Sequence, residues 1–144
     1  MNSLTIMSAI CRNLHAAFPN ISVYREHIDE NFDEPSFFVW TSDVTTSPMM
    51  NNRFIQNHSI EISYFPHRLN TSKYQECFQI GLDLCDVMRS ITVDNKPLWA
   101  NNPTYHIVED SHLQWSASFR IELFYDENKA PLMASLTNSV DFKL

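Results

Sequence analysis

Apolar and polar positions alternate along residues 113–125 of the chain. Every second residue from Leu113 to Tyr125 is apolar or aromatic, and the residues between them are polar until Phe124. Successive side chains of a β-strand point to opposite faces, whereas a helix would spread the same apolar residues around its circumference. The pattern therefore predicts a long antiparallel strand with one buried face and one face in contact with water.

Apolar side chains recur at three- and four-residue steps near the N-terminus, which predicts a helix that ends at about Phe18. Asn2 or Ser3 can cap its first turn, and Pro19 ends it because proline cannot continue a helix. The expected buried stripe consists of Leu4, Met7, Cys11, Leu14 and Phe18.

The same spacing predicts a second helix from Thr71 or Ser72 to about Ser90. Ser72 and Gln75 fit a capping box, in which each side chain bonds the backbone N–H of the other residue. The single glycine, Gly81, lies on the apolar stripe, where it costs about 1 kcal/mol relative to alanine. We therefore expect Gly81 to let this helix approach a sheet closely. The stripe comprises Tyr74, Cys77, Phe78, Gly81, Leu84, Cys85 and Met88.

Four other segments have the composition of strands. The run from Phe37 to Thr41 is rich in β-forming apolar residues, which is typical of a strand covered on both faces. Residues 42–52 contain turn formers, a proline and two methionines, and are expected to form a long exposed hairpin loop. Residues 91–102 are expected to be a connection. The four expected strands are 21–25, 37–41, 54–65 and 105–108.

These elements predict an α+β fold in one domain, residues 1–144, with residues 126–144 as a C-terminal extension. The order is α-β-β-β-α-β-β. Short links favour hairpins, and both helices have one apolar stripe. We therefore expect an antiparallel sheet of four to five strands with the two helices packed on one face.

The composition excludes several classes of function, although no motif identifies one. The chain has 44% hydrophobic and 19% charged residues, which are values of a globular protein. Its formal net charge is −7, and no cluster of basic residues suggests binding to a phosphate backbone. A single glycine excludes Gly-rich phosphate loops and nucleophile elbows. The three cysteines form no paired motif, and no apolar segment reaches membrane-spanning length, so we expect a soluble protein of a reducing cytoplasm.

Candidate catalytic or metal-binding residues all have a simpler interpretation. His106 and His112 flank an expected turn, but the tight ligand spacing of a zinc site is absent. Cys77 and Cys85 lie on an apolar stripe, where free cysteine acts as a small hydrophobe. The acidic residues 26–34 are typical of a solvated loop rather than of an acid/base pair. We therefore expect no enzymatic activity, no metal and no cofactor.

Three features are instead typical of surfaces that contact a partner. Met49 and Met50 lie in a polar segment, where methionine suits adaptable contacts. Phe124 falls on the polar face of the long strand. The C-terminal segment contains apolar residues outside the expected sheet, although it can equally pack on its own domain. The expected subunit or partner interface comprises Met49, Met50, Asn51, Asn52, Arg53, Arg120, Glu122, Phe124, Met133 and Leu136.

Taken in order, these segments resemble one family. An N-terminal helix ending in FPNISVYRE is followed by PSFFVW and by a strand ending in SYFP. A helix TSKYQECFQIGLDLCDVMRSI, a hairpin YHIVEDSHLQWSASFRIELFY and a tail starting at Met133 complete the chain. This pattern resembles the small tail terminator proteins of phages and phage-like particles, particularly those with contractile tails in Gram-positive hosts.

The resemblance implies a structural role in the virion, at the head-proximal end of the tail, after assembly in the host cytoplasm. Such proteins form a hexameric ring on the last ring of tail tube protein, end polymerisation, and offer a platform to the tail sheath and to the neck or connector protein. DNA passes through the ring without specific binding, and an acidic lumen would let it slide. A closed ring needs two different patches on each subunit.

Two alternatives remain open at the level of sequence. Another neck component, such as a stopper or connector subunit, would contact the head protein rather than tube protein. A small α+β enzyme or ligand-binding domain would instead have a concave polar pocket with convergent titratable groups.

Overall fold

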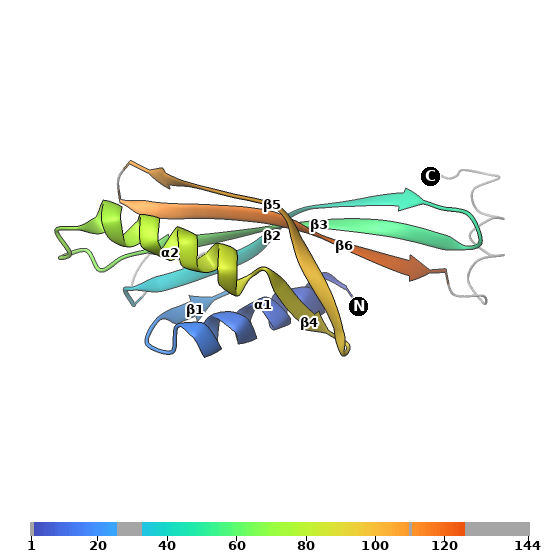
Figure 1. Ribbon diagram of the computed structural model, residues 1–144, viewed down its shortest axis with the longest axis horizontal. Coiled ribbons are helices and arrows are strands. Elements are labelled where there is room, and N and C mark those ends of the chain that lie inside the picture. The colour runs from blue at the N-terminus through green and yellow to red at the C-terminus, as the bar shows by residue number, and fades with distance from the viewer. Residues whose placement is uncertain (1, 26–32, 110, 126–144) are drawn as a thin grey trace.

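The computed structural model describes residues 2–25, 33–109 and 111–125 of the 144-residue chain. Two helices and six strands form a single elongated body, and a three-stranded sheet continues past the helices at one end (Figure 1). In chain order the elements are α1 (Ser3–Ala17), β1 (Ser22–Tyr24), β2 (Ser36–Pro48), β3 (Arg53–Phe65), α2 (Lys73–Val87), β4 (Ser90–Val93), β5 (Lys96–Val108) and β6 (His112–Phe124).

The six strands form one mixed sheet in the order β1-β2-β3-β6-β5-β4. β1 runs parallel to β2, and every other neighbouring pair is antiparallel. The sheet curls where β5, after pairing with β4 as far as Trp99, begins to pair with β6 at Ala100, and a register shift between Asn101 and Thr104 lies in this region. The β4–β5 hairpin therefore folds across the body instead of continuing the plane of the sheet (Figure 1).

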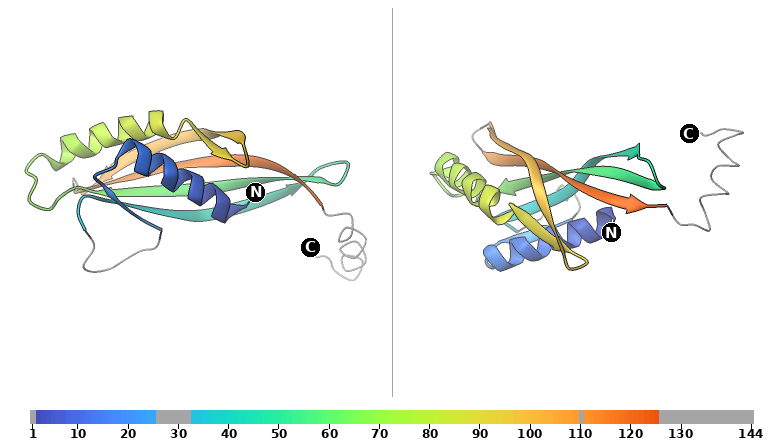
Figure 2. Two further views of the ribbon diagram at one scale, coloured as in Figure 1. Left: turned by 90° about the horizontal axis from the view of Figure 1, so that it is seen from below. Right: turned by 45° about the vertical axis from the view of Figure 1, so that its right-hand side comes forward.

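The predicted antiparallel sheet of four to five strands with both helices on one face is therefore wrong. A sixth strand arises because residues 91–102, expected to be a connection, form β4 and the first half of β5. The sheet is mixed because β1 pairs in parallel with β2 instead of forming an antiparallel hairpin with it. The β4 hairpin also contacts α1, so α1 lies between two parts of the curled sheet (Figure 2).

Asparagine and aspartate make the β2–β3 and β4–β5 hairpin turns in this glycine-poor chain. Asp94 and Asn95 join β4 to β5 with φ values of 52° and 63°. Asn51 and Asn52 lie between β2 and β3 with φ values of 62° and 59°. These residues tolerate the left-handed region better than other non-glycine residues. The expected long loop over 42–52 is thus wrong, because the strand continues to Pro48 and only a short turn separates it from Arg53.

The alternation along residues 113–125 predicts β6 correctly. Its inward residues are buried, with Trp115 and Phe119 fully inaccessible to water, whereas the intervening residues are partly or fully exposed. β3 supplies the facing apolar residues, since Ile62 is opposite Trp115 and Ile60 is opposite Ala117. The dense run Phe37–Val39 on β2 is also buried, as its composition predicts.

α1 packs by a stripe that differs in part from the predicted one. Cys11 and Leu14 are buried as expected, but Ile6, Ala9 and Ile10 form the rest of the buried face and Leu4 is exposed. The predicted cap at Asn2 is confirmed, because its side chain accepts a bond from the backbone N–H of Thr5. At the other side of the helix, Arg12 donates to the carbonyl of Thr92 at 3.1 Å, which fastens α1 to β4.

α2 approaches β5 as closely as the position of Gly81 suggests. A Cβ atom built on Gly81 would lie 2.5 Å from two ring carbons of Tyr105, well inside van der Waals contact. Cys77, Ile80 and Leu84 complete the buried face of the helix. The predicted capping box is wrong, since Ser72 is the N-cap residue but its side chain makes no capping hydrogen bond.

Candidate assembly surfaces

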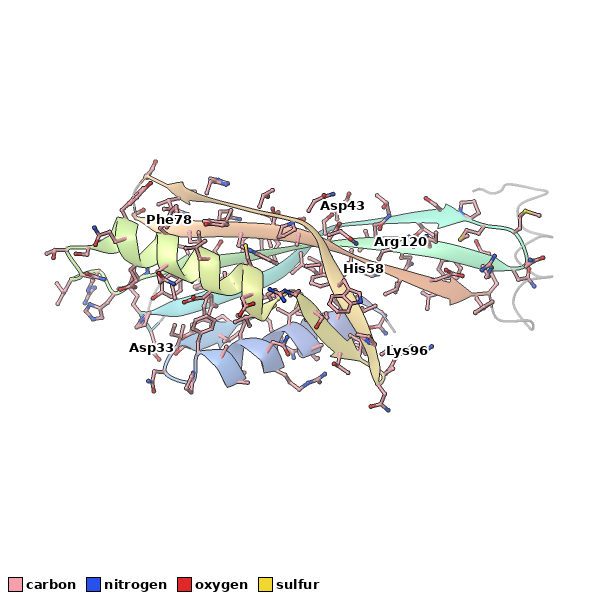
Figure 3. All side chains as sticks on the ribbon, in the orientation of Figure 1. Asp33, Asp43, His58, Phe78, Lys96 and Arg120 are labelled. Atoms are coloured by element: carbon pink, nitrogen blue, oxygen red, sulfur yellow. The ribbon has the colours of Figure 1, made fainter. Side chains whose placement is uncertain are left out.

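The sheet extends beyond the helices as an arm, which we define as residues 43–48 of β2, 53–59 of β3 and 120–124 of β6. These three stretches pair in register, with Thr45 opposite Asn57 and Asn57 opposite Arg120. Every β2 residue of the arm is exposed, whereas the first four residues of the same strand are buried. The arm forms the right-hand end of the molecule in Figure 1, and Figure 3 labels Asp43, His58 and Arg120 near its base.

The tip of the arm brings together most of the predicted interface residues. Met50 and Phe124 are exposed over 80% and 70% of their surface, and Phe124 is opposite Arg53 in the β3–β6 register. Arg53 forms an ion pair with Glu122 at 2.7 Å and bonds the carbonyl of Met50 at 3.4 Å. The tip surface, comprising Met49, Met50, Arg53, Glu122 and Phe124, thus combines exposed apolar side chains with one fixed charge pair.

The remaining predicted interface residues divide into two groups. Asn51 and Asn52 form the turn at the tip, directly after Met49 and Met50, and their backbone lies in the left-handed region. Arg120 lies nearer the body, on the same outward side of β6 as Glu122 and Phe124. Met133 and Leu136 lie outside the described residues.

A second apolar surface lies on α2, and it includes Tyr74 and Phe78, which the predicted stripe assigned to the core. Tyr74, Phe78 and Leu82 follow one another at four-residue steps along the helix, and about half of each side chain is exposed. The rings of Tyr74 and Phe78 stack with centroids 6.5 Å apart, and Phe78 meets Tyr105 edge-on at 6.1 Å. Together with the exposed Leu69, these residues define the α2 surface. In the sequence, this surface is indicated by the width of the apolar arc on α2, which is wider than one face of a sheet can cover.

The outward face of the central sheet is polar. A shallow hollow of about 340 Å³ opens there, and Glu61 is the one titratable residue among those that line it; the lining residues are Ser42, Ser59, Glu61, Asn101, Asn102, Ser116, Ala117 and Ser118. Glu61 accepts a hydrogen bond from Gln114 at 2.7 Å, and the amide oxygen of Gln114 accepts one from Ser63 at 2.6 Å. A single engaged carboxylate does not form the pair of groups that acid/base chemistry requires.

The perturbed titratable groups lie inside the fold. Burial raises the pKa of the Cys77 thiol to about 11, so this cysteine is protonated near neutral pH and packs as an apolar residue. Burial also raises the pKa of Tyr64, whose hydroxyl donates to Glu76 at 2.6 Å. Burial lowers the pKa of His58, whose Nε2 lies 3.1 Å from the side-chain oxygen of Gln56. Of these groups, Tyr64 joins β3 to α2 through its bond to Glu76, whereas the bond between His58 and Gln56 lies within β3.

The histidines flanking the β5–β6 turn do not converge on a metal position. His112 stacks on Phe65 with ring centroids 4.8 Å apart, and desolvation is the main cause that lowers its pKa. Within the described ranges, no group of three or more His, Cys, Asp or Glu side chains is arranged to hold a metal ion. In that same part of the chain, none of the helices is both long enough and apolar enough to span a membrane.

The fold and the sequence of this chain are similar to those of known proteins. A solved structure titled "Virion of native gene transfer agent (GTA) particle" has a chain with the same fold at a TM-score of 0.55, with 14% identity over 82% of this chain and 93% of that chain. A second solved structure is 12% identical over 88% of this chain and 99% of its own, and its TM-score of 0.34 is too low to carry an argument. The curated proteins contain no match. The family model described as phage tail terminator protein matches residues 5–131, so the chain belongs to the phage tail terminator family.

Proposed function

We propose that this phage tail protein forms a ring of six copies on the head-proximal end of the tail tube. The ring ends polymerisation of the tube, and of the sheath where the tail is contractile, and joins the tail to the neck or connector protein. Its partners in this role are further copies of itself, tube protein, sheath protein and the connector. Assembly takes place in the host cytoplasm, and the finished ring belongs to the virion.

The observation that carries the proposal is a pair of different exposed apolar surfaces at opposite ends of one subunit. The tip surface lies at the far end of the arm, and the α2 surface lies beside the body at the other end (Figures 1 and 3). In a ring whose copies lie side by side with their arms in one direction, these two unlike surfaces would lie on opposite faces of the ring, where tube protein and the connector would bind. Large exposed apolar side chains on a small protein are typical of contact sites.

DNA would pass through such a ring without specific binding. The chain has a net charge of −7, and sequence-independent binding to DNA depends on clustered Lys and Arg that contact phosphates. On the outward side of the arm, Arg120 stands near Glu122, and Arg53 is paired with Glu122, so basic side chains are accompanied by acidic ones. A surface of mixed charge attracts DNA less than a basic one.

Native mass spectrometry of the purified protein, alone and with tube protein, tests the proposal. We expect a closed oligomer, either in solution or only when tube protein is present. Monomer in both conditions, at high protein concentration, would contradict the proposal. Binding to the head-side connector without any binding to tube protein would instead favour the other neck components.

A further inference from the structure

The arm has an open strand edge on each side. β1 pairs with β2 only over Ser36–Phe38, so among the described residues no strand pairs with the outer edge of residues 43–48. β5 pairs with β6 only as far as Phe119, because the first half of β5 turns away to pair with β4. Within the described ranges, residues 120–124 of β6 therefore have no strand paired to this edge.

The hydrogen-bond alternation shows which backbone groups point outward from these edges. The N–H of Met49 bonds the carbonyl of Arg53, so Val44, Thr46 and Pro48 are the β2 residues whose backbone groups face away from β3. The N–H of Tyr125 bonds the carbonyl of Asn52, so Arg120, Glu122 and Phe124 are the corresponding residues on β6. Each edge thus presents three residues to an incoming strand.

The two edges are suited to each other. They are similar in length, six residues on β2 and five on β6, and they lie at the same level of the arm, because Thr45 and Arg120 are both opposite Asn57. Both strands are antiparallel to β3, so both run toward the tip. When two subunits related by a ring axis lie side by side with their arms in one direction, the β2 edge of one faces the β6 edge of the next as a parallel pair.

The β2 edge lacks most of the features by which proteins protect an exposed edge. Natural edges are protected by lysines, prolines, bulges or a covering element. Here a register shift precedes Asp43 and a proline ends the strand, but residues 44–47 are Val, Thr, Thr and Ser without a charge. The same residues are also exposed on both faces, and such sheets depend on additional strands or a packed layer for stability.

From these features we infer that the β2 edge of one subunit, residues 43–48, pairs in parallel with the β6 edge of the next copy, residues 120–124. This inference rests on the proposed ring and identifies the contact that closes it. Six copies with three arm strands each would form a barrel of about 18 strands, and barrels of 16–18 strands leave a water-filled channel. The ring would therefore be lined by a continuous sheet, and the free edges of the monomer would disappear.

A proline at an outward-facing backbone position tests this pairing. Thr46→Pro removes an N–H that faces the open edge and leaves the β2–β3 hydrogen bonds in place, since edge strands accept proline there. Thr46→Ala is the matched control, because it removes the same side chain and keeps the N–H. We expect Thr46→Pro to weaken assembly at least tenfold in native mass spectrometry while Thr46→Ala assembles as the wild type does. Equal assembly of both variants would overturn the inference and leave the ring itself intact.

Hydrogen–deuterium exchange on the wild-type protein gives an answer that does not depend on any variant folding. On assembly, backbone amides of residues 43–48 and 120–124 should both become protected by at least tenfold. Protection of the α2 surface without these two segments would overturn the edge pairing. Protection of residues 120–124 alone, already present in the monomer, would show that residues 126–144 of the same chain occupy the β6 edge, and would also overturn it. A wild type that never assembles, even with tube protein, would refute the proposed function.

Discussion

Gly81→Ala should destabilise the protein, although alanine is the better helix former. Alanine gains about 1 kcal/mol over glycine in a helix interior. The new methyl group, however, would lie 2.5 Å from two ring carbons of Tyr105 and 3.1 Å from a third carbon at the base of that ring. Because the ring base is anchored to β5 and the ring face packs against Phe78, the contact cannot be relieved by moving a flexible side-chain end. Overpacking of this kind typically costs about 1–3 kcal/mol.

The net effect expected for Gly81→Ala is therefore a loss of about 1 kcal/mol in the free energy of unfolding. For a domain of this size that corresponds to a decrease in Tm of about 4 °C. Urea unfolding followed by circular dichroism measures the change, and an unchanged m-value shows that it is a change in stability.

Tyr105→Ala supplies the background that isolates the cause. Without the ring, the methyl group of Gly81→Ala meets no obstacle, so the substitution should stabilise that variant by about 1 kcal/mol. The two backgrounds thus give effects of opposite sign, with a coupling of about 2 kcal/mol. A stabilising effect of Gly81→Ala in the wild-type background would refute the close packing of α2 on β5.

Further substitutions in three regions of the molecule have defined outcomes. Burial lowers the pKa of His58, so the unfolded chain binds a proton near the ordinary pKa of about 6.5 while the folded chain does not, and stability is lost as the pH falls below that value. His58→Gln should therefore make the loss of unfolding free energy between pH 7 and 5 shallower in urea titrations. An unchanged slope would exclude this role of His58. Met50→Glu and Leu82→Glu alter exposed side chains, so each should change the monomer's free energy of unfolding by less than about 0.5 kcal/mol. Each should nevertheless weaken assembly in native mass spectrometry. Unchanged assembly of either variant would show that its surface is not part of an interface. Arg53→Ala breaks a partly exposed ion pair with Glu122, so a double-mutant cycle with Glu122→Ala should give a coupling below about 1 kcal/mol; a much larger coupling would mean that the pair is buried.

The sequence pattern predicted those elements in which the spacing of apolar residues follows directly from the burial of one face. β6 alternates because one face lies on the core and the other in water, and the alternation remains visible along its whole length. The position of Gly81 likewise predicted a close helix–sheet contact, because glycine inside a helix usually needs a packing reason. The sequence also indicated that Met49, Met50 and Phe124 are exposed, because methionine and phenylalanine in polar surroundings have no core to enter.

The errors arose where tertiary structure overrides local pattern. Residues 42–48 are mostly polar and exposed, so they resemble a loop, yet pairing with β3 makes them a strand. Residues 91–102 contain Pro97 and Asn102 and resemble a connection, yet they form a hairpin that crosses the body. Tyr74 and Phe78 were assigned to the core because periodicity shows that a face is apolar. It does not show whether that face is covered by the same chain or is left for a partner.

The role we propose for this protein is to cap the tail tube and stop its growth. Electron microscopy of tails produced with and without the protein tests it most directly. We predict tubes of uniform length with a ring at one end when the protein is present, and overlong or unsheathed tubes when it is absent. Tubes of the same uniform length in both preparations, with no ring density lost, would contradict the account.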